Sequence, residues 1–394
     1  MAIYLDHAAT TPLRAEVLEA MLPFLTEAYG NASSSHAFGR RARAALDESH
    51  ERIATGIRAE AREIVLTSGG TEALNLGLKG AAWAGKAHGH RIVTSAVEHH
   101  AVGHTLRHLE KFGFEVVELP VDRYGRVDPD QVDAAITDRT ILVSIMFANN
   151  EVGTIQPIAD IAARVHAHKG VLFAVDAVQA APHLEIDVDA LGVDVLAMSA
   201  HKFEGPKGVG AMYLRHGTHI LAQQQGGSQE RHRRGGTENV AGAVGMATAF
   251  DLARAERAES AKRLRRLRER LQKAALAVDS VELTGHPKER LPGHLSLIAR
   301  DTDGTAVAMS LDLHGIAASV GSACTSGSTE VSHVLTAMGY PEEEARGALR
   351  LTLGRTTTDA EIEEAAAIIP GVLASMRIGG SAVASDPLGQ GLPA

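Results

Sequence analysis

The chain contains one cysteine, and the residues around it indicate a reactive thiol. Cys324 lies in the stretch SVGSACTSGSTE, residues 319–330, among Gly, Ser, Ala and Thr. A cysteine that fills a hydrophobic core normally stands in an apolar run, and this one does not. The thiolate is the nucleophilic form of cysteine, and glycines beside it favour a flexible loop. We therefore interpret Cys324 as a nucleophile carried by a loop.

A second set of reactive side chains follows the predicted strands of a sheet. These strand ends are followed by His99, Asn150, Asp176 with Gln179, and His201 with Lys202. Ligands of an open parallel sheet bind beyond the carboxyl ends of its strands. We therefore expect these side chains to face a common site.

The stretch SGGTEA, residues 68–73, follows another predicted strand and has the composition of a phosphate-binding turn. Its glycines let backbone N–H groups approach an anion, and Thr71 opens a helix whose N-terminus favours negative charge. An ordinary capped turn has the same composition, so the stretch alone identifies no ligand.

Taken together, these groups suit pyridoxal phosphate. The cofactor needs an amine for a Schiff base, a carboxylate that holds the pyridinium proton, and a cradle for its phosphate. Lys202, Asp176 and Thr71 supply these three functions, and His99 could stack on the ring. Read singly, a strand-end Asp is more often a helix cap and a lone Lys a surface charge. The combination is what indicates the cofactor.

Short apolar runs alternate with helical patterns and predict the elements that position these groups. The runs are residues 63–68, 91–97, 114–121, 140–148, 171–177 and 193–200. They are rich in β-branched residues and nearly continuous in hydrophobicity, as parallel strands buried on both faces are. With helical patterns at 71–85 and 155–169 between them, they predict an α/β fold: a mostly parallel central sheet flanked by helices. Residues 209–215 are expected to add an antiparallel strand.

Two domains are expected from the order of the elements. Residues 14–258 form the large α/β domain, and residues 1–13 with 259–378 form a smaller α+β domain. A long charged amphipathic helix at 251–276 links them. The segment 379–394 is small, polar and rich in Gly and Pro, and we expect it to be a disordered tail.

The composition excludes several classes of protein. The 394 residues carry a formal net charge of −9, which argues against nucleic-acid binding and against binding to a membrane surface. The chain has no apolar run of the roughly 18 residues that a membrane span needs, and its first residues do not resemble a signal peptide. A single cysteine forms no internal disulfide, so we expect a cytoplasmic enzyme.

The stretches that carry these residues resemble the cysteine desulfurases, a class V aminotransferase group within the fold-type I pyridoxal-phosphate enzymes. The resemblance covers roughly residues 3–358. Its motifs stand in the family's order: YLDHAATTP, SGGTEALNLGLKG, VEHHAV, ANNEVGTIQPI, DAVQAAPHLEIDV, MSAHKFEGPKGVGAMYLR, GGSQERHRRGGTENV and GSACTSGSTEVSHVLTAMG. The long loop around Cys324 is similar to that of the NifS/IscS-type subgroup.

The resemblance implies a role for each candidate residue. Lys202 would be the Schiff-base lysine, Asp176 the partner of the pyridine nitrogen, and Cys324 the acceptor of sulfur. The remaining roles are the ring hydroxyl for Gln179, ring stacking for His99, the phosphate for Thr71, Ser199, His201 and the partner subunit's Thr237, and the substrate carboxylate for Asn150 and Arg350. Gly70 and Asn150 would also be cofactor-binding residues. Lys202, His99 and Cys324 would be the catalytic residues.

The implied function is a homodimeric cysteine desulfurase. It would convert L-cysteine to L-alanine, leave a persulfide on Cys324, and pass the sulfur to an iron–sulfur scaffold protein or a tRNA-thiolating enzyme. The alternatives are a selenocysteine lyase, a class V aminotransferase, and a non-catalytic binding protein with the same fold. A transaminase would have no need of Cys324.

Two other patterns have ordinary explanations. His100, His104 and His108 have the spacing of a helical metal site, but the chain has no HExxH motif and no cysteine cluster, so we expect no metal. The resemblance adds only a transient iron–sulfur cluster with Cys324 as a ligand. The basic stretch RHRR, residues 231–234, is either a solvated loop or a source of positive charge beside the cofactor.

Overall fold

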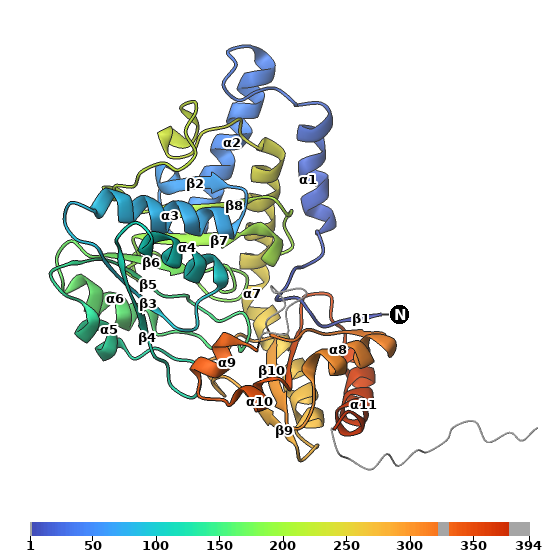
Figure 1. Cartoon of the computed structure of the whole chain (residues 1–394). Coiled ribbons are helices and arrows are strands. Elements are labelled where there is room, and N and C mark those ends of the chain that lie inside the picture. The colour runs from blue at the N-terminus through green and yellow to red at the C-terminus, as the bar shows by residue number, and fades with distance from the viewer. Residues whose placement is uncertain (1, 322–330, 378–394) are drawn as a thin grey trace, which may run out of the picture.

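The computed structural model describes residues 2–321 and 331–377 (Figure 1). Both Cys324 and the predicted tail at 379–394 lie outside the described residues. Among the described helices, none has the combination of length and apolar character that a membrane crossing requires.

A seven-stranded sheet forms the centre of the larger part of the molecule (Figure 1). In spatial order its strands are β2 (Ile64–Thr67), β8 (Gly210–Leu214), β7 (Val195–Ser199), β6 (Leu172–Asp176), β5 (Thr140–Ser144), β3 (Arg91–Ser95) and β4 (Glu115–Leu119). All neighbours pair in parallel except β8, which runs antiparallel to both β7 and β2. The predicted mostly parallel sheet and its antiparallel member are confirmed.

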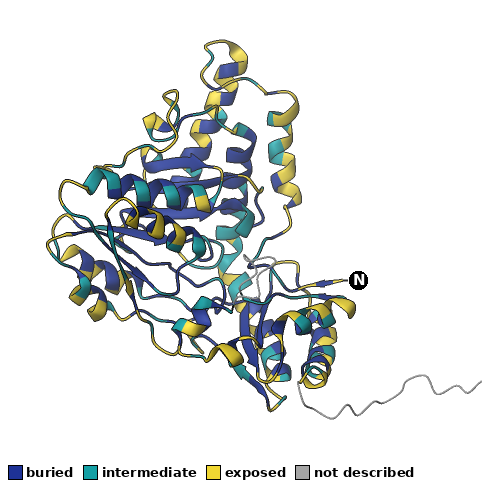
Figure 2. Cartoon of the chain, viewed as in Figure 1, coloured by how far each residue is buried: buried dark blue, intermediate teal, exposed yellow. Residues whose placement is uncertain are grey.

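Helices cover both faces of this sheet, which explains why the strands are apolar throughout. The helices of the larger part are α1 (Ala15–Thr26), α2 (Ala37–Gly56), α3 (Gly70–Gly85), α4 (His100–Glu110), α5 (Pro129–Ala135), α6 (Ile158–His166) and α7 (Val240–Ala275). Successive residues of a strand point to opposite faces. In β5, Leu142 belongs to a hydrophobic cluster that includes residues of α3 and α4, whereas Val143 belongs to another that includes residues of α2, α6 and α7. Apart from the edge strand β4, which is partly exposed, the strands are accordingly buried on both sides (Figure 2).

The smaller part combines both ends of the described chain around a hydrophobic cluster of its own. Its strands are β1 (Ile3–Tyr4), paired in parallel with β11 (Ile316–Ala317), and the antiparallel set β9 (Val281–Leu283), β10 (His294–Ala299) and β12 (Ala348–Thr352). Its helices are α8 (Gly304–Leu313), α9 (His333–Ala337), α10 (Glu342–Ala345) and α11 (Asp359–Ser375). Short 3-10 turns at Ala61–Glu63, Ala200–Lys202 and Gln229–His232 complete the elements.

Helix α7 connects the two hydrophobic clusters and is longer than the sequence predicts. The prediction placed its start at residue 251, but the helix begins at Val240, where the Asn239 side chain accepts a hydrogen bond from the Gly242 N–H at 2.9 Å. Its first turns are apolar and buried, so they lack the charged face on which the prediction relied. The predicted boundary at residue 258 therefore falls inside a continuous helix, and the division into domains stays a prediction.

Candidate active site

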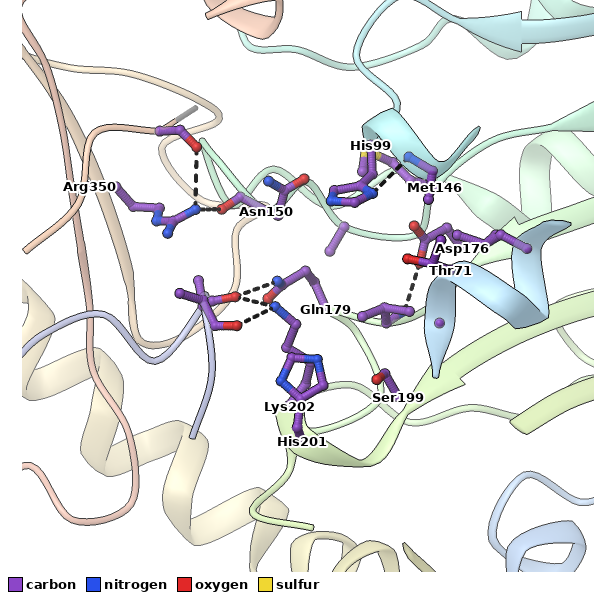
Figure 3. Close-up of a pocket in the computed structure, with 18 residues that line it drawn as sticks. Thr71, His99, Met146, Asn150, Asp176, Gln179, Ser199, His201, Lys202 and Arg350 are labelled. Carbon is purple, nitrogen blue, oxygen red and sulfur yellow. Dashed lines mark hydrogen bonds between the residues drawn. The ribbon is translucent and has the colours of Figure 1, made fainter. Parts of the chain in front are cut away.

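A cavity of about 300 Å³ lies at the carboxyl edge of the large sheet (Figure 3). It brings together ten of the predicted site residues: Gly70, Thr71, His99, Asn150, Asp176, Gln179, Ser199, His201, Lys202 and Arg350. Asp176 and Ser199 are the last residues of β6 and β7, and His99 caps the helix that follows β3. The convergence follows from parallel strands that all end at the same edge.

One end of the cavity is formed by the start of α3. The helix begins at Gly70, and the capping residue Gly69 gives it no side-chain cap, so backbone N–H groups of the first turn face no capping side chain. A Cβ atom on Gly70 would lie 2.7 Å from Cγ2 of Val178, so this close approach requires glycine. With Thr71 beside it, this helix start has the form of an anion site.

The basic stretch at residues 231–234 contributes charge beside this end of the cavity. The Arg234 Nε atom donates to Glu72 Oε1 at 2.9 Å, and Glu72 stands in the first turn of α3. The pairing offsets a negative charge next to the proposed phosphate site. Arg233 instead donates to the Arg62 carbonyl, and Arg231 and His232 are exposed. The cofactor-side interpretation is therefore supported for Arg234 and not for the whole stretch.

Asp176 and Lys202 both line the cavity (Figure 3). Burial raises the pKa of Asp176 to about 6, although its Oδ1 accepts a hydrogen bond from the Val178 N–H at 2.9 Å and the Lys202 charge acts in the opposite direction. Lys202 Nζ donates to the carbonyls of Ala8 and Ala9 at 2.5 and 2.9 Å. A buried carboxylate and an amine thus face one cavity.

His99 is fixed as a neutral ring at the cavity wall. Its Nδ1 accepts a hydrogen bond from the Ala101 N–H at 3.0 Å, which orients the imidazole at the start of α4. Burial, helped by the Lys202 charge, lowers the pKa of His99 to about 4. At neutral pH the ring is therefore uncharged, and Nε2 carries its proton.

The other end of the cavity carries a buried cation. Arg350 is 3% exposed, and its Nη1 donates to the Asn150 carbonyl at 2.9 Å. Its Nη2 lies 2.8 Å from Asp6 Oδ1, an ion pair that joins the N-terminal segment to β12. A guanidinium at the end of a cavity is suited to bind a substrate carboxylate.

These groups fit pyridoxal phosphate. The start of α3 offers N–H groups for the phosphate, and Asp176 offers a carboxylate for the ring nitrogen. Lys202 offers the amine, and His99 offers a flat neutral ring. The side-chain Nε2 of Gln179 already donates to the Ala8 carbonyl at 2.9 Å, so Gln179 also holds the N-terminal segment against the cavity.

Two predicted site residues are not in this cavity. Thr237 is exposed and does not line it, in keeping with its expected role toward a partner subunit. Cys324 is outside the described residues, and Gly321, which lines the cavity, is the last described residue before the gap.

Sequence reasoning missed three residues that shape the site. Asp6 pairs with Arg350, and the buried Asn149 side chain accepts hydrogen bonds from the N–H groups of Glu151 and Val152 beside the cavity. Glu98 is 4% exposed and precedes His99. The only signal in the sequence was their place within the family motifs: Asp6 lies in YLDHAATTP, Glu98 in VEHHAV and Asn149 in ANNEVGTIQPI.

Glu98 should make the stability of the protein depend on pH. Its Oε1 accepts from Ser95 Oγ at 2.6 Å and from the Met146 N–H at 2.9 Å, its Oε2 is buried without a partner, and burial raises its pKa to about 8. Between about pH 4.5 and 8 the folded state keeps a proton that the unfolded chain has lost, so wild-type stability falls as the pH rises. The titration of this carboxyl changes stability by at most about 1.4 kcal/mol per pH unit.

The variant Glu98→Gln cannot titrate, so its stability relative to wild type should increase from about pH 4.5 to 8 and stay level outside that range. Denaturant unfolding of the cofactor-free protein at several pH values measures this difference. A difference that does not change with pH would show that Glu98 is as acidic in the folded protein as in the unfolded chain.

Comparison with known proteins supports the family resemblance. A family model described as aminotransferase class-V matches residues 3–364. A protein named cysteine desulfurase IscS from Methanosarcina thermophila is 48% identical over 376 residues, which cover 95% of this chain and 93% of that protein. A solved structure titled NifS-like protein has a TM-score of 0.90 at 36% identity and covers 95% of this chain and 100% of its own. Another, titled SspA in complex with cysteine, has a TM-score of 0.79 at 33% identity and covers 89% and 98%.

The matches cover nearly the whole length of each of these relatives. The two solved structures share the mixed α/β fold described above. The predicted family resemblance is confirmed, and so is the fold-type I architecture that it implied. The chain belongs to the cysteine desulfurases of the aminotransferase class-V family, which are pyridoxal-phosphate enzymes.

Proposed function

We propose that this enzyme converts L-cysteine to L-alanine and that Cys324 receives the sulfur as a persulfide. The observation that carries the proposal is the composition of the cavity, which Lys202 and Asp176 line together with the start of α3 and the buried Arg350. An amino acid held at Arg350 by its carboxylate has its amino group near the middle of the cavity. The relatives named as cysteine desulfurases support cysteine as that amino acid.

The proposal gives these residues the following tasks. Bound pyridoxal phosphate supplies an electron sink for chemistry at the α-carbon of the substrate. Asp176 holds a proton at the ring nitrogen, and Lys202 provides the amine that attaches the cofactor and moves the α-proton. The neutral His99 stacks on the ring and can hand over its Nε2 proton, while Thr71, Ser199 and His201 hold the phosphate.

The sulfur step is a nucleophilic attack by the Cys324 thiolate on the substrate sulfur. The new S–S bond forms while the C–S bond of the substrate breaks, and the electron pair stays with the carbon, which takes a proton and becomes the methyl group of alanine. The persulfide then gives its outer sulfur to an acceptor. We propose an iron–sulfur scaffold protein or a tRNA-thiolating enzyme as that acceptor, and a cytoplasmic location, because the chain has one thiol and no internal disulfide.

Product analysis tests this function directly. The holoenzyme with L-cysteine and a thiol reductant should release alanine and sulfide in equal amounts without any keto acid. A requirement for a keto acid would identify an aminotransferase, and the absence of turnover with an intact cofactor spectrum would identify a binding protein. A strong preference for selenocysteine over cysteine would identify a selenocysteine lyase.

We also propose that the enzyme is a homodimer with shared sites. Thr237 is exposed on a loop, so in a dimer it is available to the phosphate site of a partner subunit. Helix α1 carries three leucines at helical spacing, Leu18, Leu22 and Leu25, each about half exposed. Contiguous exposed apolar side chains of this kind favour contact with another protein surface.

Mixed dimers should reveal the sharing. A chain with Lys202→Ala is combined with a differently tagged chain with Thr237→Ala, and the heterodimer is isolated by both tags. If Thr237 serves the neighbouring site, one site of the heterodimer is intact and the other carries both changes. Titration with pyridoxal phosphate should then show one site of wild-type affinity per heterodimer. A heterodimer in which both sites bind weakly would place Thr237 in its own subunit's site.

A further inference from the structure

The arginine at the substrate end of the cavity is held rigidly by its backbone. Arg350 stands in β12 opposite Ser296 of β10, and on its other side it exchanges backbone hydrogen bonds with Ser319. Its Nη1 is engaged by the Asn150 carbonyl. The strand and this carbonyl therefore position the guanidinium without the help of an acidic side chain.

Asp6 approaches this guanidinium from outside the cavity. Arg350 lines the cavity and Asp6 does not, yet Asp6 Oδ1 lies 2.8 Å from Arg350 Nη2. The backbone of Asp6 is fixed by a bridge to Thr352, and its carbonyl accepts the Tyr4 hydroxyl at 3.0 Å. Asp6 is thus a fixed carboxylate that contacts the arginine without lining the cavity.

The charges of this pair bear on how strongly a substrate is bound. A guanidinium that is 3% exposed needs a counter-charge, and Asp6 is its only ion-pair partner in residues 2–321 and 331–377. A substrate carboxylate brings a second negative charge to the same cation. Two carboxylates that share one cation repel each other, so the resident carboxylate weakens the binding of the second.

We propose that Asp6 is the resident counter-ion of Arg350 and that it moderates the affinity of the site for the α-carboxylate of amino acids. The inference rests on the proposed function, in which Arg350 binds that carboxylate. Cysteine and alanine carry the same carboxylate, so the interaction with Arg350 is equally strong in substrate and product. A fully attractive arginine would retain alanine after each turnover, and Asp6 prevents this.

The test measures the contribution of the carboxylate to binding without any turnover. Two ligands are titrated calorimetrically into the cofactor-free protein: phosphopyridoxyl-L-alanine, and phosphopyridoxyl-ethylamine, which is identical except that it lacks the carboxylate. The ratio of their dissociation constants is the carboxylate preference. In Asp6→Asn the amide oxygen still accepts from Arg350, but the charge is gone. We expect the carboxylate preference of this variant to rise at least tenfold over wild type.

A matched control separates this effect from a general loss of charge. Glu72→Gln also removes a carboxylate from an arginine pair, with similar exposure of the acidic side chain (23% against 19%) and a similar distance (2.9 against 2.8 Å), but its partner is Arg234 at the phosphate end. Because both ligands carry the phosphate, Glu72→Gln should leave the carboxylate preference unchanged.

The outcomes distinguish this inference from the proposed function. A wild-type protein that binds both ligands equally would contradict the role of Arg350, and the inference with it. A clear preference in wild type that stays the same or falls in Asp6→Asn would overturn the inference alone, and Asp6 would then only position the arginine or support the fold. If Asp6→Asn is too unstable to titrate, acetate at constant ionic strength should raise its melting temperature more than that of wild type. An equal rise would overturn the inference.

Discussion

Replacing Cys324 with serine or alanine is expected to lower alanine formation by about a thousandfold or more. The loss of a catalytic nucleophile acts on this scale or above it, and a serine hydroxyl is a far weaker nucleophile toward sulfur than a thiolate. Binding of the cofactor should not change, because Lys202, Asp176 and the start of α3 are intact. The visible absorption of the holoenzyme should therefore equal that of wild type.

Two features of the chain allow the result of this experiment to be assigned to the thiol of Cys324. Cys324 is the only cysteine, so in the variants no other thiol can take its place. Thr325→Ser changes the residue next to Cys324 in the sequence without touching the thiol, and it should retain nearly full activity. Normal rates of alanine formation in Cys324→Ala would show that the thiol has no catalytic role.

Asp176→Asn is expected to reduce turnover by about a hundredfold or more while the cofactor remains bound. An amide cannot hold the proton at the ring nitrogen as a carboxylate does, so the ring becomes a weaker electron sink. The hydrogen bonds of Lys202 to the Ala8 and Ala9 carbonyls and the start of α3 do not involve this carboxylate. Alanine formation divided by bound cofactor, with the cofactor quantified by its absorption, measures the effect.

Asp194→Asn is the matched control for this change. Asp194 is as buried as Asp176, at 6% exposure, and burial also raises its pKa. It accepts a hydrogen bond from the Phe173 N–H at 2.8 Å but does not line the cavity. Asp194→Asn should therefore affect stability without affecting turnover per bound cofactor. Equal losses of turnover in the two variants would mean that Asp176 acts only through the fold.

The sequence was sufficient to predict the site where its chemistry depends on strand ends. Buried apolar strands end at Asp176 and at Ser199, and Lys202 comes three residues after Ser199. Parallel strands bring their carboxyl ends to one edge of the sheet. The apolar character of those strands comes from burial on both faces, so the parallel sheet could be predicted from the same pattern. Thr237 lies on a loop, and apart from the family resemblance no pattern in the sequence around it indicated a role in the site.

Other features depend on contacts that leave no local pattern. Asp6 and Arg350 are 344 positions apart and meet only because β1 and β12 belong to the same small part of the fold. The start of α7 was placed eleven residues late because its first turns are buried on all sides and show no amphipathic period. Glu98 looked like an ordinary acid, since its pKa is set by burial in the folded protein.

Transfer of sulfur to Cys324 is the central claim, and mass spectrometry of one peptide tests it most directly. The holoenzyme is incubated with L-cysteine in the absence of reductant, blocked with an alkylating agent and digested, and alanine is quantified in the same sample. We predict that the peptide containing Cys324 gains the mass of one sulfur atom, in proportion to the alanine formed in the first turnover. Alanine that accumulates while this peptide stays unmodified would contradict the persulfide mechanism.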